Sequence, residues 1–397
     1  MKYSLSSLCE YRKGKVNVDG LNKDTYISTE NMLPNKGGVI RATSLPTTSQ
    51  TQEYKKGDVL VSNIRPYFKK IWQAEYDGGC SNDVLVFKAN ENTDKDFLYY
   101  VLADDAFFNY SMATSKGTKM PRGDKTSIMQ YGVPHYDIVE QKKIACVLRL
   151  LDKKIEFNNK INNNLEQQAQ AIFKEWFIDN PENEEWSTGT FSELIKSTLN
   201  GDWGKESPTG NNTEKVYCIR GADIPEVKAG NKGKMPTRYI LPKNFANKQL
   251  EAGDIVVEIS GGSPTQSTGR CTAITQSLLD RYDSGMVCTN FCKAIKPKTG
   301  YSLFVYYYWQ YLYEKGVFFS YENGTTGIKN LDFSGFIETE SIIIPPFDRI
   351  MAFDNYCKSI FNQIFANGKQ SEHLAAFRDT LLPKLMSGEL DVSDIDL

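Results

Sequence analysis

Two stretches in the first third of the chain combine arginine and lysine with residues that form turns. They run from residue 63 to 70 and from residue 115 to 125. Loops of this composition contact DNA phosphates through lysine and backbone N–H groups, and guanine through the fork of an arginine. A basic loop that is merely solvated has the same composition, so both interpretations stay open. The candidate contacts are Arg65, Lys69, Lys70, Lys116, Thr118, Lys119, Arg122 and Lys125.

A second pair of loops, at residues 260–270 and 321–330, is more polar and less basic. Different side chains at approximately matching places would let the two loop pairs recognise different base sequences. Arg41 and Arg220 are further candidates, either as base-contacting residues or as structural ion-pair partners. The candidates in the later loops are Ser263, Arg270, Asn323, Thr325, Thr326 and Lys329.

Catalytic and metal-binding patterns are missing from the sequence. Only two histidines occur, His135 and His373, which leaves little for a His-based zinc site or a Ser-His-Asp triad. Residues 201–205 have the wrong glycine spacing for a phosphate-binding loop. Ile344 stands where the tetrapeptide of adenine methyltransferases needs Asn or Asp. We therefore expect no catalytic residues, no metal and no cofactor in this chain.

The elements that position the candidate loops occur twice. Five landmarks recur in the same order, which argues against chance and for two copies of one unit. The Gly-Asp-apolar segment of each copy predicts a turn that leads into a buried strand. The landmarks are Ile40-Arg41-Ala42 with Ile219-Arg220-Gly221, residues 57–61 with 253–257, Cys80-Ser81-Asn82 with Cys288-Thr289-Asn290, Gly117-Thr118 with Gly324-Thr325, and Val133-Pro134 with Ile344-Pro345.

Each copy continues into a long helix whose seam positions lie alternately four and three residues apart, the heptad pattern of a coiled coil. We expect the two seams to bury each other, with polar residues such as Asn158 and Asn367 fixing the register. Two separate helices are the alternative, and Pro383 is expected to kink or end the second one. The predicted seam comprises Ile144, Leu148, Leu151, Ile155, Asn158, Asn162, Leu165, Ile172, Ile360, Ile364, Asn367, Leu374 and Leu381.

The predicted fold class is α+β, with two similar mixed α/β domains and two long helices. The net charge is -2, yet residues 1–139 carry 18 Lys and Arg against 16 Asp and Glu, so any DNA binding would use local patches. The eight cysteines show no C-x-x-C pair and are expected to be reduced thiols. We find no apolar run of membrane-spanning length and no signal peptide, and expect a cytoplasmic protein. The predicted divisions are residues 1–139, 140–180, 181–346, 347–390 and a loosely ordered acidic tail at 391–397.

Three segments carry a family resemblance. Residues 150–155 with 164–170 and Trp176-Phe177, residues 377–389, and the Gly117-Thr118-Lys119-Met120-Pro121-Arg122 loop together resemble the specificity subunit of type I restriction-modification systems. The resemblance covers nearly the whole chain.

The resemblance implies two target-recognition domains, at residues 1–139 and 181–346, held apart by an antiparallel coiled coil and bound to the two halves of an interrupted site in double-stranded DNA. It further implies two modification subunits that carry S-adenosylmethionine and methylate adenine, and restriction subunits with motor and nuclease activity that use ATP and Mg²⁺. The rival hypothesis is an assembly scaffold that recruits partners through its helices without recognising bases. A self-sufficient methyltransferase or nuclease is the least favoured alternative.

Overall fold

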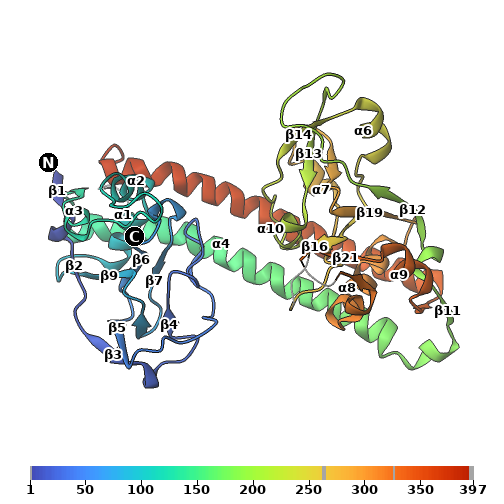
Figure 1. Cartoon of the computed structure of the whole chain (residues 1–397), viewed down its shortest axis with the longest axis horizontal. Coiled ribbons are helices and arrows are strands. Elements are labelled where there is room, and N and C mark those ends of the chain that lie inside the picture. Colours follow the sequence, from blue (N-terminus) through green and yellow to red (C-terminus); the bar gives the residue numbers. More distant parts are fainter. Residues whose placement is uncertain (1, 262–264, 325–326, 393–397) are drawn as a thin grey trace. The chain divides into compact units, whose positions relative to one another are not determined.

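The computed structural model describes residues 2–261, 265–324 and 327–392 (Figure 1). It divides into two compact units, each a mixed α/β structure to which both long helices contribute. Unit 1 comprises residues 1–154 and 374–397, and unit 2 comprises residues 155–373. The mixed α/β class with two long helices is the one that the sequence predicted. Most of the predicted acidic tail, residues 393–397, lies outside the described residues.

Among the residues described in unit 1, the strands form two four-stranded sheets and one two-stranded sheet. The first sheet is antiparallel, with the order β2 (Cys9–Tyr11), β9 (Val84–Ala89), β6 (Val59–Ser62) and β7 (Ile71–Gln73). The second has the order β3 (Lys15–Asn17), β5 (Gln50–Tyr54), β8 (Gly78–Cys80) and β4 (Tyr26–Ile27). β1 (Lys2–Ser4) pairs with β10 (Gly132–Pro134). The helices are α1 (Lys95–Ala103), α2 (Asp105–Ala113), α3 (Lys125–Ile128) and the 3-10 helices Leu5–Ser7, Val18–Gly20 and Pro66–Phe68.

Strand β6 shows why the Gly-Asp segment continues as an unbroken apolar run. Val59 and Val61 belong to a core that includes residues of α1 and of both long helices. Leu60 belongs to a different core, which lies between the two four-stranded sheets. Because successive side chains of a strand point to opposite faces, a strand that is covered on both faces needs apolar residues at every position.

The described part of unit 2 repeats this arrangement with additions. Its four-stranded antiparallel sheet has the order β12 (Ile195–Asn200), β19 (Cys292–Pro297), β15 (Ile255–Glu258) and β17 (Cys271–Ala273). The other sheets are β14 (Thr237–Ile240) with β13 (Glu214–Ile219) and β18 (Met286–Cys288), β16 (Ser260–Gly261) with β21 (Lys329–Leu331) and β20 (Glu322–Asn323), and β11 (Ser187–Gly189) with β22 (Ile342–Ile344). The helices are α5 (Ile224–Lys228), α6 (Pro242–Lys248), α7 (Gln276–Leu279), α8 (Ser302–Glu314), α9 (Phe333–Thr339) and the 3-10 helices Pro181–Glu185, Phe191–Glu193, Gly221–Asp223 and Val317–Tyr321.

The Gly-Asp turn before β6 and β15 is built in the same way in both units. Gly57 and Gly253 have φ values of 90° and 98°, in the region that favours glycine. The Asp58 carboxylate accepts a hydrogen bond at 2.8 Å from the N–H three residues earlier, and Asp254 does the same at 2.8 Å. The Gly-Asp dipeptide therefore occurs twice because both units contain the same turn. In this turn the glycine adopts the positive φ, and the aspartate accepts the hydrogen bond that closes it.

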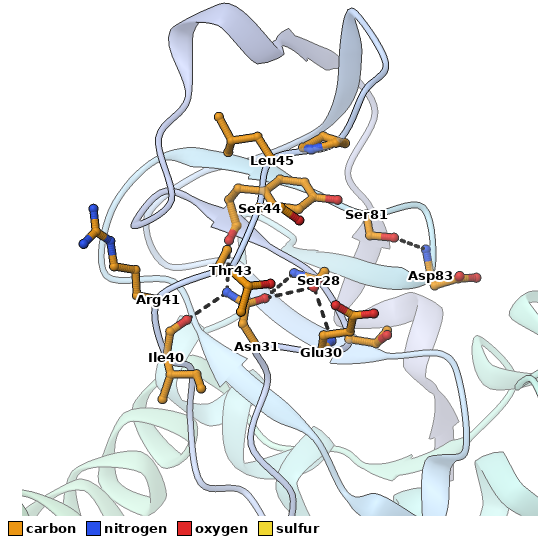
Figure 2. Close-up of a pocket in the computed structure, with 14 residues that line it drawn as sticks. Ser28, Glu30, Asn31, Ile40, Arg41, Thr43, Ser44, Leu45, Ser81 and Asp83 are labelled. Atoms are coloured by element: carbon orange, nitrogen blue, oxygen red, sulfur yellow. Dashed lines mark hydrogen bonds between the residues drawn. The ribbon is translucent and has the colours of Figure 1, made fainter. Parts of the chain in front are cut away.

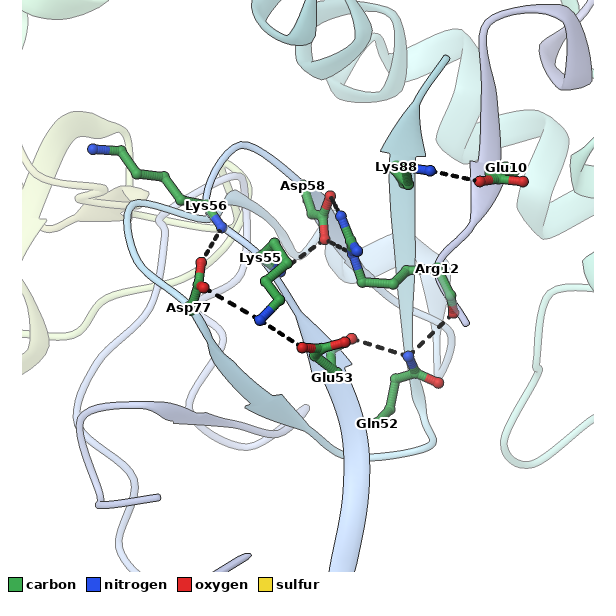
Figure 3. A network of polar contacts seen from close by, with 9 residues as sticks. All are labelled: Glu10, Arg12, Gln52, Glu53, Lys55, Lys56, Asp58, Asp77 and Lys88. Atoms are coloured by element: carbon green, nitrogen blue, oxygen red, sulfur yellow. Dashed lines mark hydrogen bonds and ion pairs between the residues drawn. The ribbon is translucent and has the colours of Figure 1, made fainter. Parts of the chain in front are cut away.

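A cation completes each of these turns. Arg12, which follows β2, forms an ion pair with Asp58, and Figure 3 shows the two side chains face to face within a wider polar network. In unit 2 the cation is Lys296 of β19, whose Nζ lies 2.9 Å from a carboxylate oxygen of Asp254. Burial, the largest influence, raises the pKa of Asp254, and the N–H of Glu251 and the ammonium of Lys296 oppose that shift.

One of the five sequence landmarks is matched wrongly. Strand β4 ends at Ile27 and runs parallel to β8, just as β13 ends at Ile219 and runs parallel to β18. The residue after these strands is Ser28 in unit 1 and Arg220 in unit 2. Arg41 is therefore not the counterpart of Arg220, because pairing between strands, and not a shared Ile-Arg dipeptide, sets the register of the repeat.

The long helices α4 (Ile138–Phe173) and α10 (Phe347–Ser387) pack against each other within each unit. In unit 1, Ile144 and Leu148 of α4 share a core with Leu382 and Leu385 of α10. The prediction was that Pro383 kinks helix α10 or ends it near its last turns, and the helix continues past Pro383 and ends at Ser387, one turn later. Proline lacks one backbone donor, and near the last turn its loss removes little of the helix.

In unit 2 the helices meet through a layer of amide side chains. Asn158 Nδ2 donates to Ser371 Oγ at 3.1 Å, and Asn162 Nδ2 donates to the Ile364 carbonyl at 3.0 Å. Asn367 Nδ2 donates to Asn162 Oδ1 at 2.9 Å. Asn158 contacts Ser371, whereas Asn162, which comes later in α4, contacts Ile364, which comes earlier in α10. The two helices therefore run antiparallel and form a coiled coil. None of the residues of the predicted seam is exposed. The buried ones are Ile144, Leu148, Asn158, Asn162, Ile360, Ile364 and Asn367, and the partly buried ones are Leu151, Ile155, Leu165, Ile172, Leu374 and Leu381.

Candidate nucleic-acid interface

The two basic loops of unit 1, far apart in sequence, are joined by backbone hydrogen bonds. The N–H of Arg65 donates to the carbonyl of Pro121 at 2.8 Å, and the N–H of Gly123 donates to the carbonyl of Asn63 at 3.2 Å. Lys116 and Arg122 exchange two backbone hydrogen bonds and close the second loop on itself. The segments 63–70 and 115–125 therefore form one surface, which we call the unit 1 loop surface.

A third segment that the sequence analysis missed belongs to the same surface. The N–H groups of Asn35 and Lys36 donate to the carbonyls of Phe68 and Lys69 at 2.8 and 2.9 Å. The residues other than glycine with positive φ in the described chain are Asn35, Lys36, Arg65 and Lys69, and all four sit at this junction. Non-glycine residues in this region are costly and concentrate at functional sites. The run Pro34-Asn35-Lys36-Gly37-Gly38, rich in turn formers, was the available signal.

Most cations of the unit 1 loop surface already have a partner within the protein. Lys69 Nζ lies 2.7 Å from Asp105, and Arg122 Nη2 lies 3.1 Å from Asp83. Lys70 Nζ donates to the carbonyl of Thr29 at 2.5 Å, and burial lowers its pKa.

Lys116 Nζ lies 2.6 Å from Asp124, at the beginning of α3. The Lys116 ammonium and the N–H of Ser127 lower the pKa of Asp124 to about 2. Thr118, Lys119 and Lys125 are exposed, which suits them to phosphate contacts that do not require a fixed side chain.

The loops of unit 2 are likewise brought together. β21 lies between β16 and β20, so Ser260 and Gly261 pair with Asn330 and Lys329, and the exposed Asn323 pairs with Asn330 from the other side. Lys329 Nζ lies 2.8 Å from Glu322, which also accepts hydrogen bonds from Thr268. We call residues 258–261, 265–270, 321–324 and 327–331 the unit 2 loop surface. The candidates Ser263, Thr325 and Thr326 lie outside the described residues.

Three candidate arginines are held in ion pairs. Arg270 donates to both carboxylate oxygens of Glu258 at 2.8 and 2.7 Å, and this pairing raises the pKa of the guanidinium. Arg220 donates to both oxygens of Asp223 at 2.8 and 3.0 Å. Arg41 lies 3.3 Å from Asp24, and both side chains are largely exposed. The exposed pair is weak and easily exchanged for a phosphate, whereas the partly buried Arg270 pair is costly to open.

A pocket of about 340 Å³ lies beside the unit 1 loop surface. Figure 2 shows Asn31 at its centre, with hydrogen bonds to Ser28 and Ile40, while the Arg41 side chain points outward. Asp83, the partner of Arg122, lines the same pocket. Its lining is mainly hydroxyl, amide and carboxyl groups, so it favours polar ligands or water over an apolar ligand.

Exposed apolar side chains accompany both loop surfaces, and the sequence analysis did not single them out. Tyr67, Phe68 and Met120 are exposed in unit 1, and Phe291, Phe319 and Ile328 are exposed in unit 2. Apolar side chains at a DNA interface contact thymine methyl groups or lie against bases.

Other kinds of site find no support in the part of the chain that the structure describes. No three His, Cys, Asp or Glu side chains come together there as a metal ion would require. No helix among those residues has both the length and the apolar character needed to cross a membrane. The eight cysteines are free thiols, and seven of them are buried.

Comparison with known proteins shows which proteins this chain resembles. Residues 1–167 match the family described as the type I restriction modification DNA specificity domain. Across 76% of the chain, the sequence is 28% identical to the specificity subunit of the type I restriction enzyme MjaIX from Methanocaldococcus jannaschii, of which it covers 70%. The first 167 residues thus match a type I DNA specificity domain, and most of the chain is similar to a type I restriction enzyme specificity subunit. The matched family is described as a DNA specificity domain and the matched relative is a specificity subunit, which agrees with the resemblance found in the sequence.

Two further comparisons agree with this similarity. It is 30% identical to the specificity subunit of the HindI enzyme from Haemophilus influenzae over 45% of the chain and 40% of that relative. Its fold resembles the crystal structure of the type I restriction-modification S subunit from M. genitalium, with a TM-score of 0.55 at 16% identity over 97% of this chain and 96% of the other.

Proposed function

We propose that this chain is a type I specificity subunit that binds a two-part site in double-stranded DNA, one half through each loop surface, and so directs adenine methylation and restriction by partner subunits. The observation that carries the proposal is a repeated frame with unlike loops. The sheet order β2-β9-β6-β7 recurs as β12-β19-β15-β17, and in both units a loop after the third strand joins a loop late in the domain. A fixed frame with variable loops is how a scaffold separates stability from recognition.

In this proposal, different kinds of side chain on the loop surfaces contact the DNA backbone and the bases. Exposed lysines such as Lys119 and Lys125 supply phosphate contacts, which position the protein without reading sequence. Arginine, amide and apolar side chains face base edges. The domains at residues 1–139 and 181–346 and the helical segments at 140–180 and 347–390 are the divisions that this proposal uses.

The long helices are the proposed docking sites for two modification subunits. Leu150 and Phe377 are exposed apolar side chains on the helices of unit 1, and Phe157, Ile161 and Tyr356 are exposed on those of unit 2. Phe157 and Ile161 lie one helical turn apart and so share a face. Exposed apolar residues grouped in this way mark protein contacts. In the proposal, S-adenosylmethionine binds the modification subunits and ATP with Mg²⁺ binds the restriction subunits, in the cytoplasm where the DNA is.

The test is to map N6-methyladenine in a host that expresses this chain with the modification and restriction subunits of its system. The expected result is methylation confined to one interrupted sequence. DNA that stays unmethylated in every context would overturn the proposal.

Exchange of residues 1–139 for the matching segment of another specificity subunit distinguishes recognition from scaffolding. The proposal requires one half of the methylated sequence to change while the other half stays. A scaffold that never contacts bases would leave both halves unchanged.

A further inference from the structure

Arg65 occupies a costly backbone position in the unit 1 loop surface. Its φ and ψ are 51° and 66°, in the left-handed region, and the next residue is Pro66. Glycine is the residue that suits this conformation, and a following proline adds steric restriction. The position is nevertheless fixed, because the N–H of Arg65 donates to Pro121 and its carbonyl accepts from Phe68 at 3.0 Å.

The side chain of Arg65 lacks the internal partner that its neighbours have. Its Nε is buried with no hydrogen-bond acceptor, and its guanidinium forms no ion pair with any described residue. Lys69 and Arg122 on the same surface are each paired with an aspartate. A buried donor without an acceptor destabilises the free protein. Both costs are explained if a ligand supplies the acceptor.

The acceptor that fits is the edge of a guanine base. Guanine presents O6 and N7 side by side in the major groove, and the arginine fork donates to both. Phosphate also accepts two hydrogen bonds from arginine. Phosphate contacts, however, need only a cation within reach, and exposed Lys119 on the same surface already supplies one. A partly buried guanidinium on an immobilised backbone, beside exposed Tyr67 and Phe68, is suited to one fixed orientation against stacked bases.

We propose that Arg65 recognises a guanine in the half-site bound by unit 1. This inference rests on the proposed function and deepens it, since it names one base and the residue that selects it.

The experiment compares R65A, R65K and K119A in the full complex with modification subunits, after the wild-type methylated sequence has been mapped. The half-site that changes on exchange of residues 1–139 is the one assigned to unit 1. We expect R65A to lose about 5- to 150-fold in discrimination at a single G·C pair of that half-site and none in the other half. We expect R65K to behave like R65A, because lysine keeps the charge but lacks the fork.

K119A is the charge-matched control on the same surface. It should weaken binding of the mapped duplex and of an unrelated duplex by the same factor, and reduce the salt dependence by about one phosphate contact. If R65A gives this uniform result, Arg65 contacts phosphate and the inference is overturned. A methylated sequence that R65A leaves unchanged also overturns it.

R65G separates recognition from folding. Glycine relieves the backbone cost at this position, so R65G should unfold at the same or higher temperature than the wild type while losing the same discrimination. An R65G variant that is destabilised would assign Arg65 a structural role and overturn the inference. If the wild-type complex methylates no specific sequence, the proposed function itself fails, and that outcome is distinct from all those above.

Discussion

Units 1 and 2 give different side chains to equivalent places in one frame. The N–H of Ser62 donates to the carbonyl of Lys70 at 3.1 Å, and the N–H of Glu258 donates to the carbonyl of Arg270 at 2.8 Å. In unit 2 the side chains of Glu258 and Arg270 form an ion pair with two hydrogen bonds. In unit 1 the residue equivalent to Glu258 is Ser62, which has no charge. Lys70 instead donates to the carbonyl of Thr29.

A second equivalent place shows the same contrast. In each unit, the residue after the third strand of the sheet donates a backbone hydrogen bond to the equivalent place. The N–H of Asn63 donates to the carbonyl of Asp83 at 2.8 Å, and the N–H of Ile259 donates to the carbonyl of Phe291 at 2.9 Å. Asp83 pairs with Arg122, while Phe291 is 57% exposed and apolar. The two units therefore share the backbone hydrogen bonds that position the loops, while the charges of the loop side chains differ between them.

The largest expected effect is from R270A, which leaves the buried carboxylate of Glu258 without its cation. Loss of one partner of such a pair costs about 3 kcal/mol in the free energy of unfolding. K70A should cost far less, since no buried carboxylate is left behind. Chemical denaturation of the full chain measures both. The double variant R270A/E258Q should recover most of the loss; if R270A and K70A are equal, the contrast between the units is wrong.

A smaller effect is expected from N162A in the helix pair of unit 2. The change removes a donor to the carbonyls of Ile364 and Ala229 and an acceptor for Asn367, at a cost of about 2 kcal/mol. Amide hydrogen exchange should show faster exchange in the unit 2 part of the helices, with unit 1 as the internal control. Equal acceleration in both units would contradict a local amide layer.

Equal effects are expected from G57A and G253A, since the Gly-Asp turn is shared. A β-carbon at a positive φ costs about 1–2 kcal/mol. The β-carbon itself would meet only the flexible Lys95 side chain at position 57 and Ser302 at ordinary distance at position 253. Thermal unfolding of the two variants should give similar shifts, and a difference of more than twofold would show that the two turns are not equivalent.

The smallest effect concerns acid titration of the α3 cap. The pKa of Asp124 is lowered to about 2 from its ordinary value of 3.8, chiefly by Lys116. A lowered carboxyl pKa gives stabilisation that is present above pH 3.8 and is lost as the pH falls towards 2. The NMR signal of the Ser127 amide, whose N–H donates to Asp124 at 2.9 Å, should titrate in the folded protein with a midpoint at this lowered pKa of about 2. K116A should move the midpoint upwards, and an unmoved midpoint would rule out the pair as the cause.

The sequence could predict the features that depend on local chemistry. Gly57-Asp58 and Gly253-Asp254 are visible because a positive φ and a capped turn need those residue types, and the helix seams are visible through their spacing. The match between Arg41 and Arg220 failed because strand pairing with distant residues sets the register. Nothing in the sequence links Arg65 to Pro121, or Arg270 to Glu258, since tertiary contacts choose those partners. The turn-forming composition of residues 34–38 was visible in the sequence, but only the hydrogen bonds of Asn35 and Lys36 to Phe68 and Lys69 place this segment at the loop surface.

The pairing of β1 with β10 has a consequence for inheritance. Residues 2–4 lie against residues 132–134, and in unit 2 residues 187–189 lie against residues 342–344, so the two ends of each mixed α/β segment meet. A stretch of gene that encodes such a segment can be replaced by a homologous stretch at two crossover points whose products adjoin in the fold. Under the proposed function, recombination between related genes at these two points would replace one loop surface in one event and leave the helices unaltered.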